Sequence, residues 1–373
     1  MLGATFVFNL NRNKKYLLLI VLLITILLVY FSFQFDNYQQ PIGKIVSEEV
    51  ISTSKQVDEH GNTDNLTEQL LTVELLNSKD KGKHLEILNN YSNSQIKNHV
   101  FHKKEIVFLH LSKNNHSLSA NIEELKRDSY LIILSAFLIS LLILFNGFHG
   151  LKILISFLLN ASILIFLFLI YRHSNSNLLF LFFLIAIPLL VTLTFLITNG
   201  WNTKTKIAIF STLTGSLLTF SIGYITIACL SHQGLHYEEM ELVTRPPHLL
   251  FLSSLLIGSV GAVMDVSMTI ISSLMELVQI KKELTLKELH TFGKKIGEDI
   301  MGPMINIMFF SYLSGSIPLI LIFLRNEMSL SYTFSITLSL ELARALIGSI
   351  GIILAIPVSI WTTSFFLKKG NLL

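Results

Sequence analysis

Eight long apolar runs constrain this chain more than any other feature of its sequence. A helix that spans a bilayer needs roughly 20 predominantly apolar residues, and each run reaches or approaches that length. The runs are Tyr16–Phe33, Tyr130–Phe145, Leu151–Tyr171, Leu178–Thr198, Ile207–Leu230, Leu249–Leu274, Pro303–Phe323 and Ala345–Phe366. Charged residues make up only 14% of the chain, against roughly a quarter in soluble domains. The sequence therefore predicts an α-helical polytopic membrane protein with about eight transmembrane helices.

The short polar links between these runs differ in charge, and lysine-rich links alternate with links that are acidic or contain little lysine. Cytoplasmic loops of membrane proteins contain an excess of lysine and arginine. The acidic link with Glu238, Glu239 and Glu241 alternates with links that are rich in lysine. These lysines fall on the same side as Lys14 and Lys15: Lys152, Lys204, Lys206, Lys281, Lys282, Lys287, Lys294, Lys295, Lys368 and Lys369. The pattern predicts a multi-pass membrane protein with both termini in the cytoplasm.

The segment after the first run differs in kind from the rest of the chain. No small-residue cleavage site follows that run, which favours an uncleaved anchor helix over a signal peptide. The next residues are polar, with short alternating segments typical of half-buried strands at Gln69–Leu76, Lys83–Leu88 and Glu105–Leu111, and a weaker one at Gly43–Val50. We expect three parts: a cytoplasmic N-terminus with the anchor helix (1–35), an extracytoplasmic β-rich domain (36–128) and a seven-helix transmembrane domain (129–373).

The link at residues 278–301 is predicted to lie on the cytoplasmic surface. Apolar residues alternate there with lysine and glutamate at the near-helical spacing of an interfacial helix: Leu284, Leu286, Leu289, Phe292 and Ile296. Thr285 and Glu288 have the spacing of a capping box at its start. Pro303 suits the first turn of the next span, where its missing N–H leaves nothing unpaired. A solvated connector is the alternative interpretation.

The run at Leu249–Leu274 contains one ionisable residue, Asp265. Helical spacing places a single small and polar stripe on this helix: Ser254, Gly258, Gly261, Asp265, Thr269, Ser272 and Glu276. Lipid offers no hydrogen bonds, so the stripe should face other helices or a wet cavity. An acid inside a bilayer costs a few kcal/mol or more and by default marks a functional site. Asp265 is the leading candidate for an ion or substrate pathway, with a structural carboxylate as the alternative.

Asn306, Asp299, Glu341 and Arg344 are the other candidate pathway residues. Asn306 lies early on the next span, where it can reach the depth of Asp265. Asp299 stands before it, near the positive end of the helix dipole. Glu341 and Arg344 are three residues apart and can pair, either in a pathway or only at the outer interface.

Four glycines are predicted to let these helices pack closely. Small residues at helix interfaces allow two backbones to approach each other within a membrane. The glycines lie on the polar stripe of the Asp265 helix and on one face of the final span: Gly258, Gly261, Gly348 and Gly351.

Several function classes are disfavoured. The lone Cys229 excludes an intrachain disulfide and a cysteine-rich zinc cage. Common nucleotide-binding and hydrolase motifs are absent, as is a basic tract with interleaved aromatics that would indicate nucleic-acid binding. The histidines of the β-rich domain lack metal-ligand spacing: His60, His84, His99, His102, His110 and His116. We therefore expect a protein that is not an enzyme and that binds no cofactor or metal.

Three stretches resemble the bacterial YibE/F-like membrane proteins: Gly261–Met268, Ile296–Asn306, and Gly348–Gly351 with Pro357. The order of an anchor helix, a small outer β-domain and a multispan block is also similar to that family. Typical members have Gly-Arg-Asp where this chain has Gly297-Glu298-Asp299. The resemblance implies a protein of the bacterial plasma membrane and supports the choice of residues, and it assigns no biochemical activity.

Three hypotheses follow for the function. The leading one is a secondary transporter or ion-coupled permease, in which Asp265 accepts a proton or small ion. The second is a non-catalytic assembly, sensing or envelope-maintenance protein whose outer domain binds a protein partner. The third, an intramembrane aspartyl protease, needs two facing acids, and Asp299 sits at the membrane edge. The substrate and the oligomeric state are not encoded in any recognisable motif.

Overall fold

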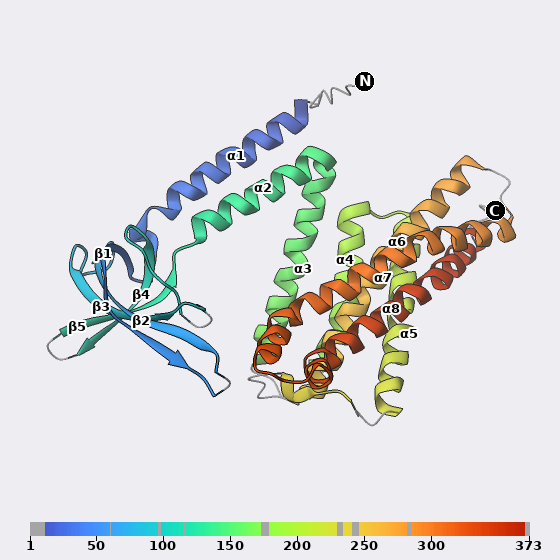
Figure 1. Cartoon of the computed structure of the whole chain (residues 1–373). Helices are drawn as coiled ribbons and strands as arrows, with labels where there is room; N and C mark the ends of the chain where they lie inside the picture. The colour runs from blue at the N-terminus through green and yellow to red at the C-terminus, as the bar shows by residue number, and fades with distance from the viewer. Residues whose placement is uncertain are drawn as a thin grey trace, which may run out of the picture. The chain divides into compact units, whose positions relative to one another are not determined.

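The computed structural model describes residues 12–59, 61–95, 98–114, 117–172, 179–229, 234–240, 246–281 and 285–369. Within these residues, eight helices are long and apolar enough to cross a membrane (Figure 1). They are α1 (Arg12–Ser32), α2 (Asp128–Asn146), α3 (Phe148–Arg172), α4 (Leu179–Asn199), α5 (Thr203–Cys229), α6 (Pro247–Ile280), α7 (Leu286–Arg325) and α8 (Leu330–Lys369). A five-stranded antiparallel sheet follows α1, so the predicted fold class is confirmed.

The chain folds as two compact units, Met1–Leu151 and Lys152–Leu373. The sheet belongs to the first unit and has the strand order β3-β2-β1-β4-β5. Its strands are β1 (Ile42–Val57), β2 (Thr63–Leu75), β3 (His84–Ser92), β4 (Ile106–Asn114) and β5 (Ser117–Leu125). The sequence pattern indicated the first four strands but missed β5, in which the alternating residues Leu118, Ala120 and Ile122 pack against the core of the sheet. β5 pairs antiparallel with β4 from Ser117 to Leu125.

Alternating aliphatic residues form the core of the sheet. Ile45, Leu71, Val73 and Val107 are completely buried on its inner face. Gln69 is also buried, and its side chain is fully used: its amide nitrogen donates to the carbonyl of Phe101 and its amide oxygen accepts from the Phe101 backbone N–H, both at 3.1 Å. This buried amide fastens the loop between β3 and β4 onto the sheet, as a buried polar group requires.

A buried lysine joins the sheet to the helices of the same unit. The Lys126 ammonium donates to the carbonyl of Ser32 at 2.6 Å and pairs with Asp128 at 2.7 Å. The rings of Phe33, Phe35 and Tyr38 lie around it, that of Tyr38 at 4.8 Å, so cation–π attraction adds to the ion pair. Tyr38 donates a hydrogen bond to Asp128. This Lys126 cluster ties the end of α1, the start of α2 and the last strand together.

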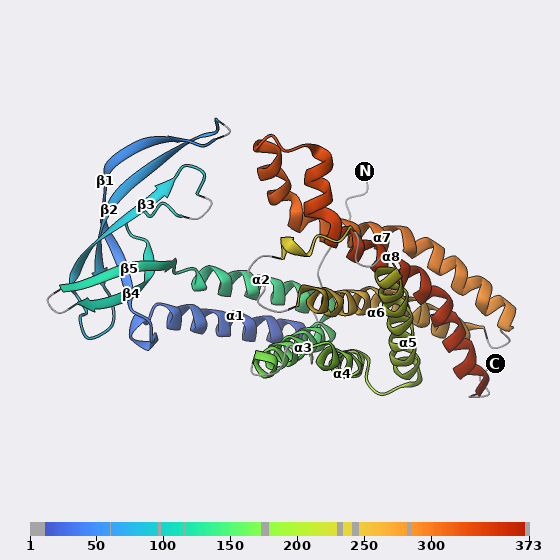
Figure 2. The same cartoon turned by 90° about the horizontal axis from the view of Figure 1, so that it is seen from below.

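Helices α1 and α2 run side by side, as Figures 1 and 2 both show. Ser32 and Ser129 share a hydrogen bond of 2.8 Å at one end of the pair. At the other end, Lys14 donates to the carbonyl of Leu144 at 3.1 Å. The two helices are therefore fixed at both ends, although most of their apolar surface is exposed.

In the second unit, α5, α6 and α8 pack against one another, α7 lies along α8, and α4 contacts α5 and α6 (Figure 2). Small residues make the close contacts possible. A Cβ atom at Gly223 of α5 would lie 2.8 Å from Ile347 of α8 and 3.2 Å from Leu255 of α6. Lipid provides no hydrophobic drive between helices, so this tight packing must supply the attraction.

The structure corrects two predictions about α7. The predicted capping box of Thr285 and Glu288 is confirmed, but the helix that it starts continues unbroken through Pro303 to Arg325. Pro303 therefore lies inside a helix and not in its first turn. A proline removes one backbone hydrogen bond, and neighbouring helices let a membrane helix tolerate that loss. The link predicted at 278–301 is thus the end of α6 and the first turns of α7, separated by a short connection.

We predict that the Lys126 cluster makes the first unit sensitive to alkali. Burial and, secondarily, the hydrogen bond to Asp128 raise the pKa of Tyr38 from 10.0 to about 12. The stabilisation from neutral Tyr38 is complete below its unfolded-state pKa of 10.0 and is lost as the pH rises towards about 12. Thermal unfolding should show wild type more stable than Tyr38→Phe at neutral pH, with the difference shrinking in alkali. A constant difference would contradict this assignment.

Candidate functional site

Asp265 lies on the uncovered face of α6. The opposite face is completely buried at Val263, Val266 and Ile270. The side chain of Asp265 is exposed, as are Gly261 and Thr269 one turn to either side. Thr269 donates a 2.8 Å hydrogen bond to the backbone carbonyl of Asp265. Within the described residues, no side chain hydrogen-bonds or pairs with the Asp265 carboxylate, so its charge is uncompensated there.

Asn306, Asp299 and Pro303 share the exposed face of α7. All three side chains are exposed, and their spacing places them on one side of the helix. Pro303 has no N–H, so the carbonyl of Asp299, four residues earlier, lacks its helical partner. This face therefore presents a carboxylate, an amide and a freed carbonyl, all oxygen ligands for a small cation.

The structure brings Asp265 and Asn306 to a similar height without joining them. Gly258 of α6 lies against the hydroxyl of Tyr312 of α7, and Gly293 of α7 lies against Leu274 of α6. Asp265 falls between these two levels on α6, and Asn306 falls between them on α7. No contact between the two side chains occurs among the described hydrogen bonds. Asp265 lies two turns after Gly258 on the same side of α6, beyond the contact between Gly258 and Tyr312.

Glu341 and Arg344 form an ion pair in the interior of the bundle. Their side chains are only 24% and 16% exposed, so other parts of the protein cover most of both. The Arg344 guanidinium also donates to the hydroxyl of Ser254 at 3.2 Å and lies 5.2 Å from the ring of Phe251. Arg344 therefore connects α8 to α6, a role that the sequence spacing did not reveal.

Three of the four predicted packing glycines lie at close helix contacts. Gly258 meets Tyr312, Gly348 meets Met308, and a Cβ atom at Gly351 would lie 2.9 Å from Thr219. Gly261 instead faces open space, where a side chain would meet no neighbouring atom. The small and polar stripe of α6 is thus covered near Gly258 and open from Gly261 onward.

Sequence reasoning missed a line of buried hydroxyl groups between α5, α6 and α8. Ser211 shares a 2.9 Å hydrogen bond with Ser359 and lies 3.5 Å from the hydroxyl of Ser267. All three serines are buried. The signal was present in α5, where Ser211, Gly215, Thr219 and Gly223 recur every four residues. Within the described residues, no three histidine, cysteine or acidic side chains gather as a metal site would require.

Two family models match the chain along most of its length. The model described as the YibE/F family N-terminal domain matches residues 36–125, and the model described as YibE/F-like protein matches residues 134–369. The chain belongs to the YibE/F-like family. The N-terminal match of this YibE/F-like protein contains the complete sheet, and the second match runs from α2 to the end of α8. No curated protein and no solved structure gives a significant match.

We predict that Gly351→Val destabilises the bundle. The new side chain would press on Thr219 and Val263, and overpacking of this kind costs about 1–3 kcal/mol. Gly315→Val is the matched control, because a side chain at Gly315 in α7 meets no neighbour. Thermal unfolding of the detergent-solubilised proteins should show a lower melting temperature for Gly351→Val alone. Equal melting temperatures would argue against close packing at Gly351.

Proposed function

We propose that the chain is a non-enzymatic secondary transporter or ion-coupled permease of the bacterial plasma membrane, in which Asp265 accepts a proton or a small cation. One observation supports this most directly. The carboxyl group lies near the middle of α6, about 27 Å from Pro247 at about 1.5 Å per residue, and has no partner among the described side chains. An ionised carboxylate at that depth costs several kcal/mol unless it is protonated, binds a cation or meets water.

Each of these outcomes makes the charge of Asp265 responsive to its surroundings. A carboxyl group that must gain a proton or a cation to remain in the bilayer is suited to couple ion movement to transport. The exposed face of α7 offers additional oxygen atoms, from Asn306 at a similar height and from Asp299 about two turns nearer the start of that helix. These residues are the proposed pathway, with a small ion or solute as cargo.

The helices supply a rigid part and an adjustable part for such a cycle. The α5–α6–α8 core is closely packed and is joined by the inward-facing Arg344–Glu341 pair. Helix α7 is much less buried and has two internal prolines, Pro303 and Pro318. Kinks in long helices form at such prolines, so α7 is the proposed moving element. The lysine pattern supports an orientation with both termini in the cytoplasm and the sheet outside.

The central prediction is that Asp265→Asn abolishes function without loss of folded protein. Asparagine keeps the shape of the side chain but cannot bind a proton or balance a cation. Growth of a deletion strain on a panel of metals, acids and antimicrobials would first define the phenotype. Asp265→Asn should then fail to complement, whereas Asp265→Glu should retain partial function. Glu276→Gln, on the same face near the end of α6, is the matched control and should complement fully.

Protein abundance and melting temperature must be measured for each variant. Full complementation by Asp265→Asn would reject an ion-accepting role. Loss of stable protein in Asp265→Asn, with Glu276→Gln unaffected, would identify Asp265 as structural instead.

A second candidate function rests on the free edge of β1. The ladder with β4 covers only Ile42–Lys44, whereas β2 pairs with β1 as far as Val57. Beyond this ladder, Val50 and Ile51 are exposed aliphatic residues, and among the described strands only β2 pairs with this part of β1. Free edges with apolar side chains are surfaces to which another extended segment can add. This feature favours the proposal of an assembly or sensing protein whose sheet binds a protein partner.

The two proposals differ in which variant removes function. Val50→Lys places a charge on the free edge of β1 and leaves the buried core of the sheet intact. In the same complementation assay, partner binding predicts that Val50→Lys loses function and that Asp265→Asn retains it. Transport predicts the reverse result. Circular dichroism of the purified variants would check that both remain folded.

A further inference from the structure

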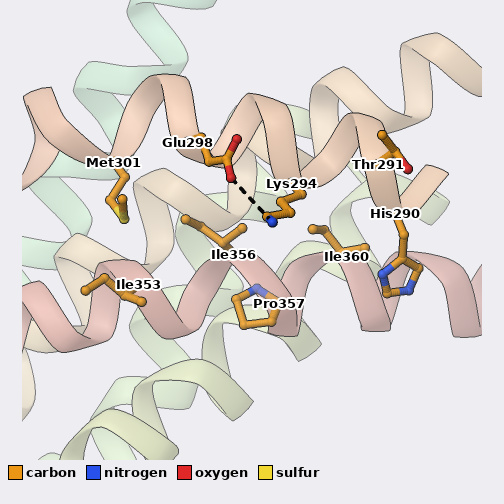
Figure 3. A pocket seen from close by; sticks show the side chains of 9 residues that line it. All are labelled: His290, Thr291, Lys294, Glu298, Met301, Ile353, Ile356, Pro357 and Ile360. Atoms are coloured by element: carbon orange, nitrogen blue, oxygen red, sulfur yellow. Dashed lines mark ion pairs between the residues drawn. The ribbon is translucent and has the colours of Figure 1, made fainter. Parts of the chain in front are cut away.

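A pocket of about 480 Å³ lies between α7 and α8, at the end of the bundle where α7 begins (Figure 3). It belongs entirely to the second unit and is separate from the Asp265 face. One wall is polar and comes from α7, and the other is apolar and comes mainly from α8. The described lining consists of His290, Thr291, Lys294, Glu298, Met301, Ile353, Ile356, Pro357 and Ile360.

The apolar wall follows from one face of α8. Ile353, Ile356, Pro357 and Ile360 recur at three- and four-residue spacing and therefore lie on the same side of that helix. Gly293 and Gly297 let α7 approach this face, because their missing side chains leave room for Ile360 and Ile356. The two helices touch along these glycines, and the pocket lies beside that contact. Its floor suits a hydrocarbon chain.

The polar wall consists of side chains one helical turn apart on α7. His290, Lys294 and Glu298 follow each other at four-residue intervals, and Figure 3 shows their side chains along one edge of the pocket. The Lys294 ammonium lies 3.6 Å from the Glu298 carboxylate, and the two side chains are 76% and 59% exposed. Such an exposed pair is worth at most about 1 kcal/mol, so a ligand with both charges can replace it.

We propose that this pocket binds a phospholipid whose head group contains both a phosphate and a primary ammonium group. Lys294, with His290 beside it, would hold the phosphate through charge-assisted hydrogen bonds. Glu298 would accept hydrogen bonds from the ammonium group, and the isoleucines of α8 would cover the upper part of an acyl chain. The inference is independent of the transport proposal.

The charges of the pocket distinguish this ligand from other membrane lipids. A purely anionic head group satisfies Lys294 but places a second negative charge beside Glu298. A choline head group has no N–H to donate to Glu298. Lysines at the same end of the helices, among them Lys281, Lys287, Lys295 and Lys368, indicate a surface that meets phospholipid head groups. Basic sites between membrane helices are established places for lipid head groups.

Native mass spectrometry of the full-length detergent-solubilised protein tests the proposal. The protein would be titrated with phosphatidylethanolamine, phosphatidylglycerol and phosphatidylcholine of identical acyl chains. We expect the first lipid to bind most tightly. Lys294→Gln should weaken its binding roughly three- to fivefold, the effect of losing one exposed charge pair. Lys295→Gln is the matched control, because Lys295 has the same charge as its neighbour Lys294 but does not line the pocket.

Glu298→Gln provides the second, independent readout. Removal of the negative charge should move the preference from phosphatidylethanolamine towards phosphatidylglycerol. Ile353→Trp, at an exposed position on the pocket wall, should reduce binding of all three lipids. Unchanged melting temperatures would confirm that the variants are folded.

Three results would overturn the proposal. Equal weakening by Lys294→Gln and Lys295→Gln would indicate general attraction to a basic surface. Tightest binding of phosphatidylglycerol by the wild-type protein would also reject a head group with both charges. An unchanged preference in Glu298→Gln would remove the proposed role of the acid.

Discussion

Close approach of α5, α6 and α8 is the constraint on which the second unit depends. Lipid tails are as apolar as leucine, so helices in a bilayer associate through shape and through hydrogen bonds that the lipid cannot replace. Both devices occur here. Gly223 and Gly351 remove the side chains that would separate the helices, and Ser211 and Ser359 hydrogen-bond across the contact. The core is therefore specified by small and hydroxyl side chains more than by its large aliphatic ones.

This packing decides which polar groups turn inward and which remain outside. The face of α6 that meets α5 and α8 buries Val263 and Ile270, and the stripe with Asp265 is left uncovered below the contact between Gly258 and Tyr312. Arg344 and Glu341, in contrast, are mostly buried and pair with each other, and Arg344 also donates a hydrogen bond to Ser254. The Arg344–Glu341 pair is thus compensated within the bundle, whereas the Asp265 carboxylate has no hydrogen-bond or ion-pair partner among the described side chains.

In the first unit, the Lys126 cluster joins the sheet to the membrane helices α1 and α2. Lys126 is buried among aromatic rings, a backbone carbonyl and a carboxylate, which together compensate its charge. Helix α1 precedes the sheet and α2 follows it. The Lys126 side chain therefore connects the two ends of the sheet domain, where the chain passes from α1 into the sheet and from the sheet into α2.

The sequence alone determined the features that depend on local relations along the chain. Apolar runs of sufficient length defined the eight spans, period-two alternation indicated strands β1 to β4, and the spacing of Thr285 and Glu288 defined the cap of α7. Each of these features arises within a few residues of its signal. The Glu341–Arg344 pair was foreseeable for the same reason, because one helical turn brings the two side chains together.

Only the tertiary structure decided the contacts between elements. The reach of Arg344 to Ser254, the open face of Asp265, the serine contacts of α5 and the pocket beside Lys294 all depend on how two helices are rotated and offset against each other. A sequence period fixes which residues share a face, but it leaves open which neighbour covers that face. The packing of the helices decides which neighbour covers it. In this protein, α7 covers the polar stripe of α6 at Gly258 and leaves Asp265 exposed.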